Sequence, residues 1–279
     1  MVGPGGSSLH PVSQPANQPA GDGRPLLAVV PVHLRAEAEA ELLMRCLVSL
    51  WRTAPDVQVL VVDAASPARE IAAQLPPVCA EVGADLVRHD EPVTRGTAVN
   101  TGLRRALEQG GDALVVAADV LFLDEHWLAP MRESDAAVVG ARLLYPTGLL
   151  AHAGLAFSPL HRWFDNRYRF GPADLPEAAV PAVCPVSGSL QLIRHATLAA
   201  VGLYDEALRA GRPDIDYCLR TFAAGLACAY EPRAWALIQE PDEMSAQDPA
   251  FHARSDAATA ELEAKHGTAA LFAHARTVP

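Results

Sequence analysis

The sequence predicts an α/β protein whose first half is a doubly wound, mostly parallel sheet. From Leu26 onward, short β-branched runs alternate with stretches whose apolar residues have helical spacing, and the alternation occurs four times by Asp119. The chain has 279 residues, and 50% of them are hydrophobic. It can therefore bury the core of one large globular domain or of two small ones.

The first half is expected to consist of strands that are each followed by a helix. The run LLAVVPV (26–32) precedes apolar positions at helical spacing between Leu42 and Leu50. The run VQVLVVD (57–63) precedes a weaker helix that should end before Pro76, because proline lacks the N–H donor and disfavours helical backbone at the preceding residue. The remaining elements are the strand ADLVRHD (84–90), the helix GTAVNTGLRRALEQGG (96–111) and the strand DALVVAAD (112–119).

The second half has a less regular pattern, which predicts mixed strands and helices fused to the first half. A hairpin or turn is expected at 147–159 and a long loop at 159–181, because the strand alternation is lost there. The other expected elements are strands at 136–146, 187–193 and 227–238, helices around 195–201 and 215–222, and a C-terminal helix after 240.

The ends of the chain differ in composition from the middle. Residues 1–24 are rich in Pro, Gly and Ser and lack a basic start and an apolar segment, so they predict a disordered leader and not a signal peptide. Residues 25–245 predict one domain with a parallel half (25–135) and a mixed half (136–245), and 246–279 predict a helical tail. Apolar runs stop well short of the roughly 20 residues of a membrane span, so no integral membrane segment is expected.

Charge and cysteine usage exclude some classes of function. The net charge is −11, which argues against nucleic acid as a partner, because such affinity comes largely from neutralising phosphates. The five cysteines have no CxxC spacing and lie among apolar neighbours, which predicts buried free thiols in a reducing, cytoplasmic compartment.

Polar residues follow three of the four predicted parallel strands. They are the loop from Pro31 to His33, Asp63 and Asp119. In an open α/β sheet, ligands bind outside the carboxyl ends of the strands. The chain has neither a GxGxxG after the first strand nor a GxxxxGK[ST], so neither of these phosphate-binding loops explains the site.

The order of motifs resembles that of the family 2 glycosyltransferases of GT-A fold, which move a sugar from a nucleoside diphosphate to an acceptor hydroxyl. The resemblance runs from about 26 to 240, with 25–135 as the nucleotide-binding half and 136–245 as the acceptor half. The motifs are VVPVH (29–33), VVDAAS (61–66), RGTAVNTGLRRAL (95–107), AADV (117–120), VVGARLLYPTGLLAHAGL (138–155), VSGSLQLIRHATLAAVGLYDEAL (186–208), PDIDYCLRTFAAG (213–225) and YEPRAWALI (230–238).

The resemblance implies a nucleotide-sugar donor site. Asp63 would bind the base, the loop from Pro31 to His33 would line the same pocket, and Arg95 would contact the base or a phosphate. Alternatives remain for two of these residues. Asp63 could be a capping acid at a strand-to-helix turn, and Arg95 could be a solvated surface arginine.

The resemblance also implies a cation motif that is incomplete in this chain. The family's D-x-D positions are Ala117, Ala118 and Asp119, so only the last acid is present. The family's histidine ligand falls at Ile238 or Gln239, neither a good cation ligand, and Asp124 is expected to cap a helix instead. Because Mg²⁺ can be held by one carboxylate and substrate phosphates, Asp119 alone could bind Mg²⁺ or Mn²⁺ weakly. We therefore expect weak or absent metal dependence.

The family's catalytic base falls on Asp214, where Pro213 replaces the usual glutamate. Asp214 would take the proton of the acceptor hydroxyl. The alternative is an N-cap role for the helix that carries Leu219, and the two roles are compatible. Asp216 should point to another face of the helix and not share a proton with Asp214.

The segment HRWFDNRYRFGP (161–172) interleaves three arginines with four aromatic residues. It could stack on a sugar and place positive charge near the diphosphate, or form a surface loop that packs its own aromatic rings; nucleic-acid binding is a third and weaker alternative. His152 and His195 have no partner at metal-ligand spacing and are expected to be packed or hydrogen-bonded.

These observations favour an inverting glycosyltransferase with an unknown hydroxyl-bearing acceptor. The missing motif residues leave a second hypothesis, a catalytically degenerate relative that binds a nucleotide sugar or a partner as a scaffold. A nucleotidyltransferase is a weaker third, because VVPVHLR (29–35) is not a Gly-rich basic loop.

Overall fold

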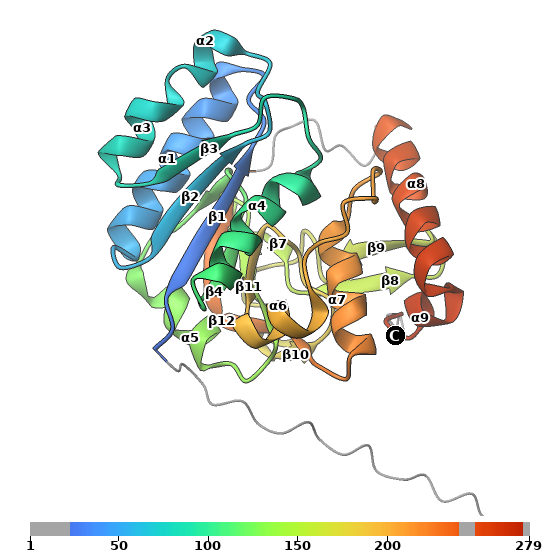
Figure 1. Ribbon diagram of the computed structural model, residues 1–279. Helices are drawn as coiled ribbons and strands as arrows, with labels where there is room; N and C mark the ends of the chain where they lie inside the picture. Colours follow the sequence, from blue (N-terminus) through green and yellow to red (C-terminus); the bar gives the residue numbers. More distant parts are fainter. Residues whose placement is uncertain (1–22, 240–248, 276–279) are drawn as a thin grey trace, which may run out of the picture.

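The computed structural model describes residues 23–239 and 249–275 (Figure 1). The predicted leader therefore lies outside the described residues except for Gly23 and Arg24, and the predicted tail is described only from Pro249 to Ala275. The main sheet has ten strands, and its central path runs β10-β12-β6-β11-β4-β1-β2-β3. The fold is the mixed α/β fold that the sequence predicts, with a mostly parallel first half.

The first half contains four parallel strands in the order β3-β2-β1-β4, and its helices cover both faces of the sheet (Figure 1). All seven residues of β1 are buried, as expected for a central strand covered on both sides. The elements are β1 (Leu26–Val32), α1 (Glu37–Thr53), β2 (Gln58–Asp63), α2 (Arg69–Ala72), α3 (Leu75–Glu81), β3 (Asp85–Arg88), α4 (Arg95–Glu108) and β4 (Asp112–Val116).

Two hydrophobic cores lie on opposite faces of this sheet. Val30 of β1 packs on the α1 side with Leu47, whereas its neighbour Val29 packs on the α4 side with Leu103. The α4 helix approaches β1 so closely that a Cβ built on Gly102 would lie 2.3 Å from Val29 Cγ2. Glycine is therefore required at this helical position for close helix–sheet packing.

The second half extends the sheet beyond β4 with strands of mixed direction. The strand β11 is antiparallel to both β4 and β6, and β12 runs parallel to β6. The elements are β5 (Val120–Leu121), η1 (Glu125–Trp127), α5 (Leu128–Glu133), β6 (Val138–Leu144), β7 (Leu150–His152), η2 (Pro176–Ala179), β10 (Ala182–Val183), β11 (Leu190–Ile193), α6 (His195–Val201), α7 (Pro213–Ala223) and β12 (Cys228–Ile238).

A separate hairpin and the C-terminal helices form a third cluster beside α7 (Figure 1). The elements are β8 (Leu155–Ser158), β9 (Trp163–Asn166), α8 (Pro249–His266) and α9 (Thr268–Phe272). Phe157 and Phe164 of the hairpin share a buried cluster with Ile215 of α7, Leu262 of α8 and Leu271 of α9. The C-terminal helices are thus packed onto the domain.

One local expectation from the sequence was wrong. The predicted loop at 159–181 contains β9, whose four residues pair with β8. The helix after β2 ends before Pro76 as expected, at Ala72, but an additional helix, α3, follows and holds Pro76 in its first turn, where the missing N–H has no helical partner to lose.

Two other local expectations, for Asp124 and for the cysteines, were confirmed. Asp124 caps η1 by accepting a hydrogen bond from His126 N at 2.8 Å. All five cysteines are free and buried. Within 23–239 and 249–275, no helix combines the length and the apolar composition needed to cross a bilayer.

Candidate active site

A cavity of about 460 Å³ opens where the carboxyl end of β4 meets the acceptor half. Its wall comes from the turn after β4, the end of β12, the segment before β11, the β8–β9 hairpin, the start of α7 and the middle of α8. Three of the predicted site residues line it, namely Arg95, Asp119 and Asp214. The cavity therefore brings together the predicted catalytic base, the remaining acid of the cation motif, and Arg95, the predicted contact to the nucleotide base or a phosphate.

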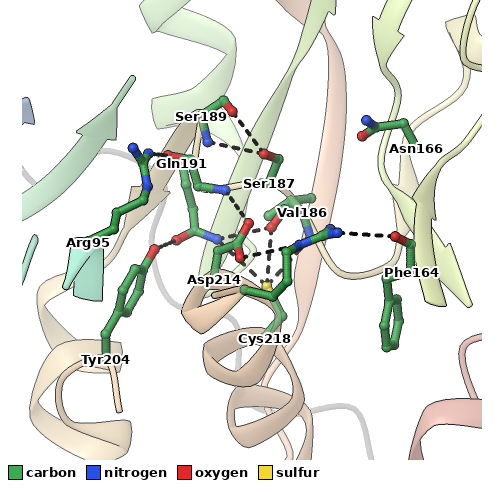
Figure 2. Close-up of polar contacts among 12 residues, drawn as sticks. Arg95, Phe164, Asn166, Val186, Ser187, Ser189, Gln191, Tyr204, Asp214 and Cys218 are labelled. Carbon is green, nitrogen blue, oxygen red and sulfur yellow. Dashed lines mark hydrogen bonds and ion pairs between the residues drawn. The ribbon is translucent and has the colours of Figure 1, made fainter. Parts of the chain in front are cut away.

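Asp214 is the second residue of α7, and its carboxylate is held by one backbone hydrogen bond and by the Arg212 side chain (Figure 2). Its Oδ2 accepts a hydrogen bond from Gly188 N at 2.9 Å, and its Oδ1 lies 3.9 Å from Arg212 Nε. The side chain is 16% exposed, so it faces the cavity without being fully solvated. The predicted N-cap role was wrong, because the N-cap position is held by Arg212 in a left-handed conformation with φ of 65°.

The peptide of Gly188 links Asp214 to Arg95. Its N–H donates to Asp214, and its carbonyl accepts from Arg95 Nη2 at 3.0 Å. A Cβ on Gly188 would lie 3.0 Å from Asp214 Cβ and 3.4 Å from Tyr204 Oη. In Figure 2, Arg95 lies on one side of Asp214, and Phe164 and Asn166 lie on the other. Gly188 thus allows the segment before β11 to approach α7 closely.

Asp216 faces away from the cavity, as its spacing from Asp214 predicts. It is fully buried and accepts hydrogen bonds from Arg220 Nε at 2.9 Å and His266 Nε2 at 2.7 Å. Lys265 Nζ lies 2.7 Å from the same carboxylate. Burial opposes ionisation of Asp216, but the hydrogen bonds from Lys265, Arg220 and His266 hold its pKa below the usual value.

Asp119 lies in the turn between β4 and β5. Its carbonyl accepts a hydrogen bond from Gln239 N at 2.9 Å, and β5 pairs with the end of β12 so that Ile238 lies opposite Val120. The position at which the family supplies a histidine is therefore beside Asp119, but the cavity there is lined by Ile238 and Ala117. Neither side chain can bind a cation.

The described part of the chain contains no group of three or more His, Cys, Asp or Glu side chains placed to hold a metal ion. A divalent cation, which the fold implies, thus finds only one carboxylate at the expected place, that of Asp119. The residues of this wall do not form a cation site by themselves.

The other predicted donor residues lie outside the wall of this cavity. Asp63 ends β2 and is fully buried; its Oδ1 accepts from Ser66 N at 2.8 Å and from Ser66 Oγ at 2.6 Å. Its Oδ2 lies 3.1 Å from Arg88 Nε without making a hydrogen bond. This arrangement matches the capping alternative for Asp63 and leaves Oδ2 without a hydrogen bond from the residues that the structure describes.

The loop after β1 is held against the same turn. Leu34 N donates to Ser66 Oγ at 2.7 Å, and the exposed His33 places Nδ1 3.3 Å from the carbonyl oxygen of Ala64. The expectation of a loop from Pro31 to His33 was wrong for its first two residues, because Pro31 and Val32 are buried within β1 and pair with Val62 and Asp63. His33 and Asp63 are therefore joined through one turn, as expected for residues at the ends of neighbouring parallel strands.

His152 lines the cavity but is held in a fixed hydrogen-bond arrangement. Its Nδ1 lies 2.6 Å from Asn166 Oδ1, and its Nε2 accepts from Ser187 N at 3.4 Å. Burial lowers the pKa of His152 to about 4, so the ring is neutral at neutral pH. His195 lies apart from this wall, and its buried Nδ1 has no hydrogen-bond partner among the described residues.

The segment 161–172 lies partly in the cavity wall and partly packs its aromatic rings elsewhere. Trp163, Phe164 and Arg169 line the cavity, whereas Phe170 stacks on Tyr145 with ring centroids 5.4 Å apart. Arg162 forms an ion pair with Glu263 of α8, and Arg167 lies over the Tyr168 ring at 5.2 Å.

Several residues of the wall could not be picked out from the sequence. Arg212 lies next to a recognised motif but has no motif position itself, and Arg254 belongs to α8, whose hydrophobic pattern is weak. Asn166 and Gly188 lie in segments that the sequence singles out, 161–172 and 186–208, but nothing in those segments marks these two residues themselves. Only the packing of the hairpin and α8 against α7 brings these residues to the cavity.

Comparisons with known proteins support the fold. No model of a known protein family matches the sequence, and no curated protein aligns with it significantly. Among solved structures, GalNAc-T7 with UDP, GalNAc and Mn²⁺ matches 81% of this chain at a TM-score of 0.62 and 16% identity. This chain spans 46% of that protein's chain.

Two further structures are similar. The mannosyltransferase PcManGT of Pyrobaculum calidifontis, in complex with GDP-Man and Mn²⁺, matches 96% of this chain and 81% of its own at a TM-score of 0.56 and 16% identity. S. aureus TarS 1–349 matches 77% of this chain and 60% of its own at a TM-score of 0.50 and 14% identity. The sheet order and these matches show that the chain has a GT-A-like fold.

Proposed function

We propose that the protein is an inverting glycosyltransferase that moves a sugar from a nucleoside diphosphate to an acceptor hydroxyl. The observation that carries the proposal is the position of Asp214, a partly exposed carboxylate fixed at the start of α7 and facing a cavity that also contains Asp119 and Arg95. The GT-A-like fold supports it, because two similar structures hold UDP with GalNAc and GDP-Man. Membership of family 2 is part of the proposal.

In the proposed reaction, Asp214 acts as the general base. As the acceptor oxygen attacks the anomeric carbon, its proton passes to the Asp214 carboxylate and the new carbon–oxygen bond forms. The bond from the anomeric carbon to the phosphate oxygen breaks, and its electron pair leaves with the nucleoside diphosphate. Attack from the face opposite the leaving group inverts the configuration. The hydrogen bond from Gly188 N fixes one carboxylate oxygen and leaves the other available for the proton.

For the donor, we propose that Asp63 and the end of β1 from Pro31 to His33 form the base-binding side, and that Arg95 and Asp119 lie on the diphosphate side. Asp63 is covered by Arg88, so binding of a base to Oδ2 would require that ion pair to open. Because Ile238 and Ala117 replace cation ligands beside Asp119, we expect a divalent cation to be weakly bound or dispensable.

A degenerate scaffold is the second candidate. It is favoured by the same two cavity residues, Ala117 and Ile238, which replace ligands that an active relative would use. Such a protein would bind a nucleotide sugar without turning it over.

Replacement of the base tests the proposal. Asp214→Asn should lower the rate of nucleoside diphosphate release in the presence of acceptor by about 10²–10⁴-fold, which is the usual contribution of a general base to the rate. The affinity for the donor should be nearly unchanged. Asp165→Asn, which removes another carboxylate of the same wall, should have a much smaller effect. If Asp214→Asn turned over like the wild type, the base assignment would be wrong. An inactive wild type that still binds the donor would favour the scaffold.

A further inference from the structure

We propose that arginine side chains, chiefly Arg212 and Arg254 with Arg169, take over the role of the cation and hold the donor's diphosphate, which makes α8 a part of the donor site. This inference rests on the proposed function and names how that site binds its substrate. A GT-A-like fold implies a cation beside Asp119, but the described residues of the wall do not supply a set of cation ligands there.

The charge of the cavity wall supports this assignment. Four arginines line the cavity, Arg95, Arg169, Arg212 and Arg254, against three aspartates, Asp119, Asp165 and Asp214. His152 adds no charge at neutral pH. The wall thus carries one more positive than negative charge (four against three) in a chain whose net charge is −11. An excess of arginine in one cavity of an acidic protein suits an anionic ligand, because the guanidinium group binds phosphate through paired N–H donors.

Arg212 is held in place by an unusual backbone. It is one of the few non-glycine residues with a positive φ, 65°, and its Nη1 donates to Phe164 O at 3.3 Å. A non-glycine residue in this region is strained, and such residues cluster at functional sites. The contact with Phe164 occupies one of five N–H donors, and the side chain is 37% exposed. Arg212 can therefore reach a ligand while it remains anchored to the hairpin.

Arg254 reaches the cavity because α8 is docked by several polar contacts. The Glu261 carboxylate accepts hydrogen bonds from Arg209 N at 3.2 Å and Ala210 N at 3.1 Å, which fixes the loop that leads to Arg212. At the end of α8, Lys265 and His266 contact the buried Asp216 of α7. One helix thus supplies Arg254 and positions the loop of Arg212.

A guanidinium group can stabilise the negative charge of the departing diphosphate, as a divalent cation does. Charge grows on the phosphate oxygen as the sugar–oxygen bond breaks, and fixed positive groups in a partly enclosed site stabilise that charge. Arg169 is anchored for the same use, since its Nε donates to Tyr145 Oη at 2.9 Å and its guanidinium lies over the Phe170 ring. Asp119 would then orient the donor without needing to bind a metal.

The test is calorimetric titration of the full chain with UDP and GDP, in EDTA and in Mn²⁺. The proposal predicts binding in EDTA, and a loss of about 10–100-fold in affinity for Arg212→Ala and for Arg254→Ala, as expected for lost charge-assisted hydrogen bonds. Arg254→Lys, which keeps the charge, should recover part of the loss. Arg209→Ala, an exposed arginine outside the cavity, and Asp256→Ala on α8 should bind like the wild type.

The outcomes separate the two proposals. Binding that requires Mn²⁺ and is unchanged in Arg212→Ala and Arg254→Ala would overturn the arginine assignment and leave the glycosyltransferase proposal intact. No binding of either nucleotide under any condition would count against both. Circular dichroism of each variant checks that it is folded, and Arg254→Lys keeps the test valid if Arg254→Ala loosens α8.

Discussion

At the scale of single residues, Asp214 and Asp216 show how two carboxylates on one helix acquire different roles. Asp214 faces the cavity with 16% of its side chain exposed, whereas Asp216 is fully buried among basic groups of α7 and α8. Their separation by two residues places them on different sides of the helix. We therefore assign proton transfer to Asp214 and structural anchoring to Asp216.

His152 gives a prediction about pH. Its pKa is lowered to about 4 by burial, against the opposing hydrogen bond with Asn166. Between this value and the unfolded value of roughly 6.5, the unfolded chain binds a proton that the folded protein does not, so stability falls as pH falls through this window. From pH 7 to pH 5, His152 should account for a loss of about 2 kcal/mol in the free energy of unfolding.

Urea unfolding of the wild type and of His152→Gln at both pH values checks this. The variant should lose about 2 kcal/mol less than the wild type between pH 7 and pH 5, because glutamine does not titrate. Parallel pH profiles for the two proteins would contradict the assignment of a neutral, buried imidazole.

The residue-level predictions from the sequence depended on motif positions. The sequence allowed the choice of Arg95, Asp119 and Asp214, because each follows or begins an element whose pattern is clear. The structure places all three in the wall of one cavity. Arg212 and Arg254 could not be chosen, because their importance depends on contacts between segments far apart in the chain. The contacts of Asp63 with Ser66 and Arg88 also required the structure.

At the scale of elements, α8 is the one whose role the sequence did not suggest. Its contacts with α7 and with the loop at 209–210 make it a wall of the cavity. Strands with continuous β-branched runs and helices with clear amphipathic spacing were predicted well, as for β1, β4 and α4. The helix α3 and the strand β9 were missed, because α3 begins with prolines and β9 is only four residues long.

The docking of α8 gives a second prediction. Asp216→Asn removes the charge that holds Lys265, Arg220 and His266, and should lower the free energy of unfolding by about 2 kcal/mol. This loss is smaller than that for breaking a fully buried ion pair, because the basic partners of Asp216 are partly exposed. Since the pKa of Asp216 is held low by these contacts, the stabilisation is present above the unfolded pKa of roughly 4 and is lost as pH falls through the folded value.

Hydrogen exchange measures this effect at the helix itself. Amides of α8 should exchange faster in Asp216→Asn than in the wild type. The control is Asp205→Asn, which removes a more exposed contact to the same Lys265 and should change stability by less than about 1 kcal/mol. Equal exchange of α8 in Asp216→Asn and the wild type would show that the buried carboxylate does not hold the helix.

At the scale of the whole molecule, the two halves of the sheet meet at the site. The parallel half supplies Arg95 and Asp119, the mixed half supplies Gly188 and Asp214, and the C-terminal cluster closes the cavity with Arg254. The overall α/β architecture followed from the alternation of strand and helix patterns. The enclosure of the cavity by the hairpin and α8 did not, because it depends on packing between segments with weak local signals.

The measurement that tests the central claim most directly is calorimetric titration of the wild-type chain with UDP-, GDP- and dTDP-sugars, each in Mn²⁺ and in EDTA. Our account predicts saturable binding of at least one nucleotide sugar at one site per chain, with little difference between the two conditions. Absence of binding for every nucleotide sugar in both conditions would contradict the assignment of the cavity as a glycosyl-donor site.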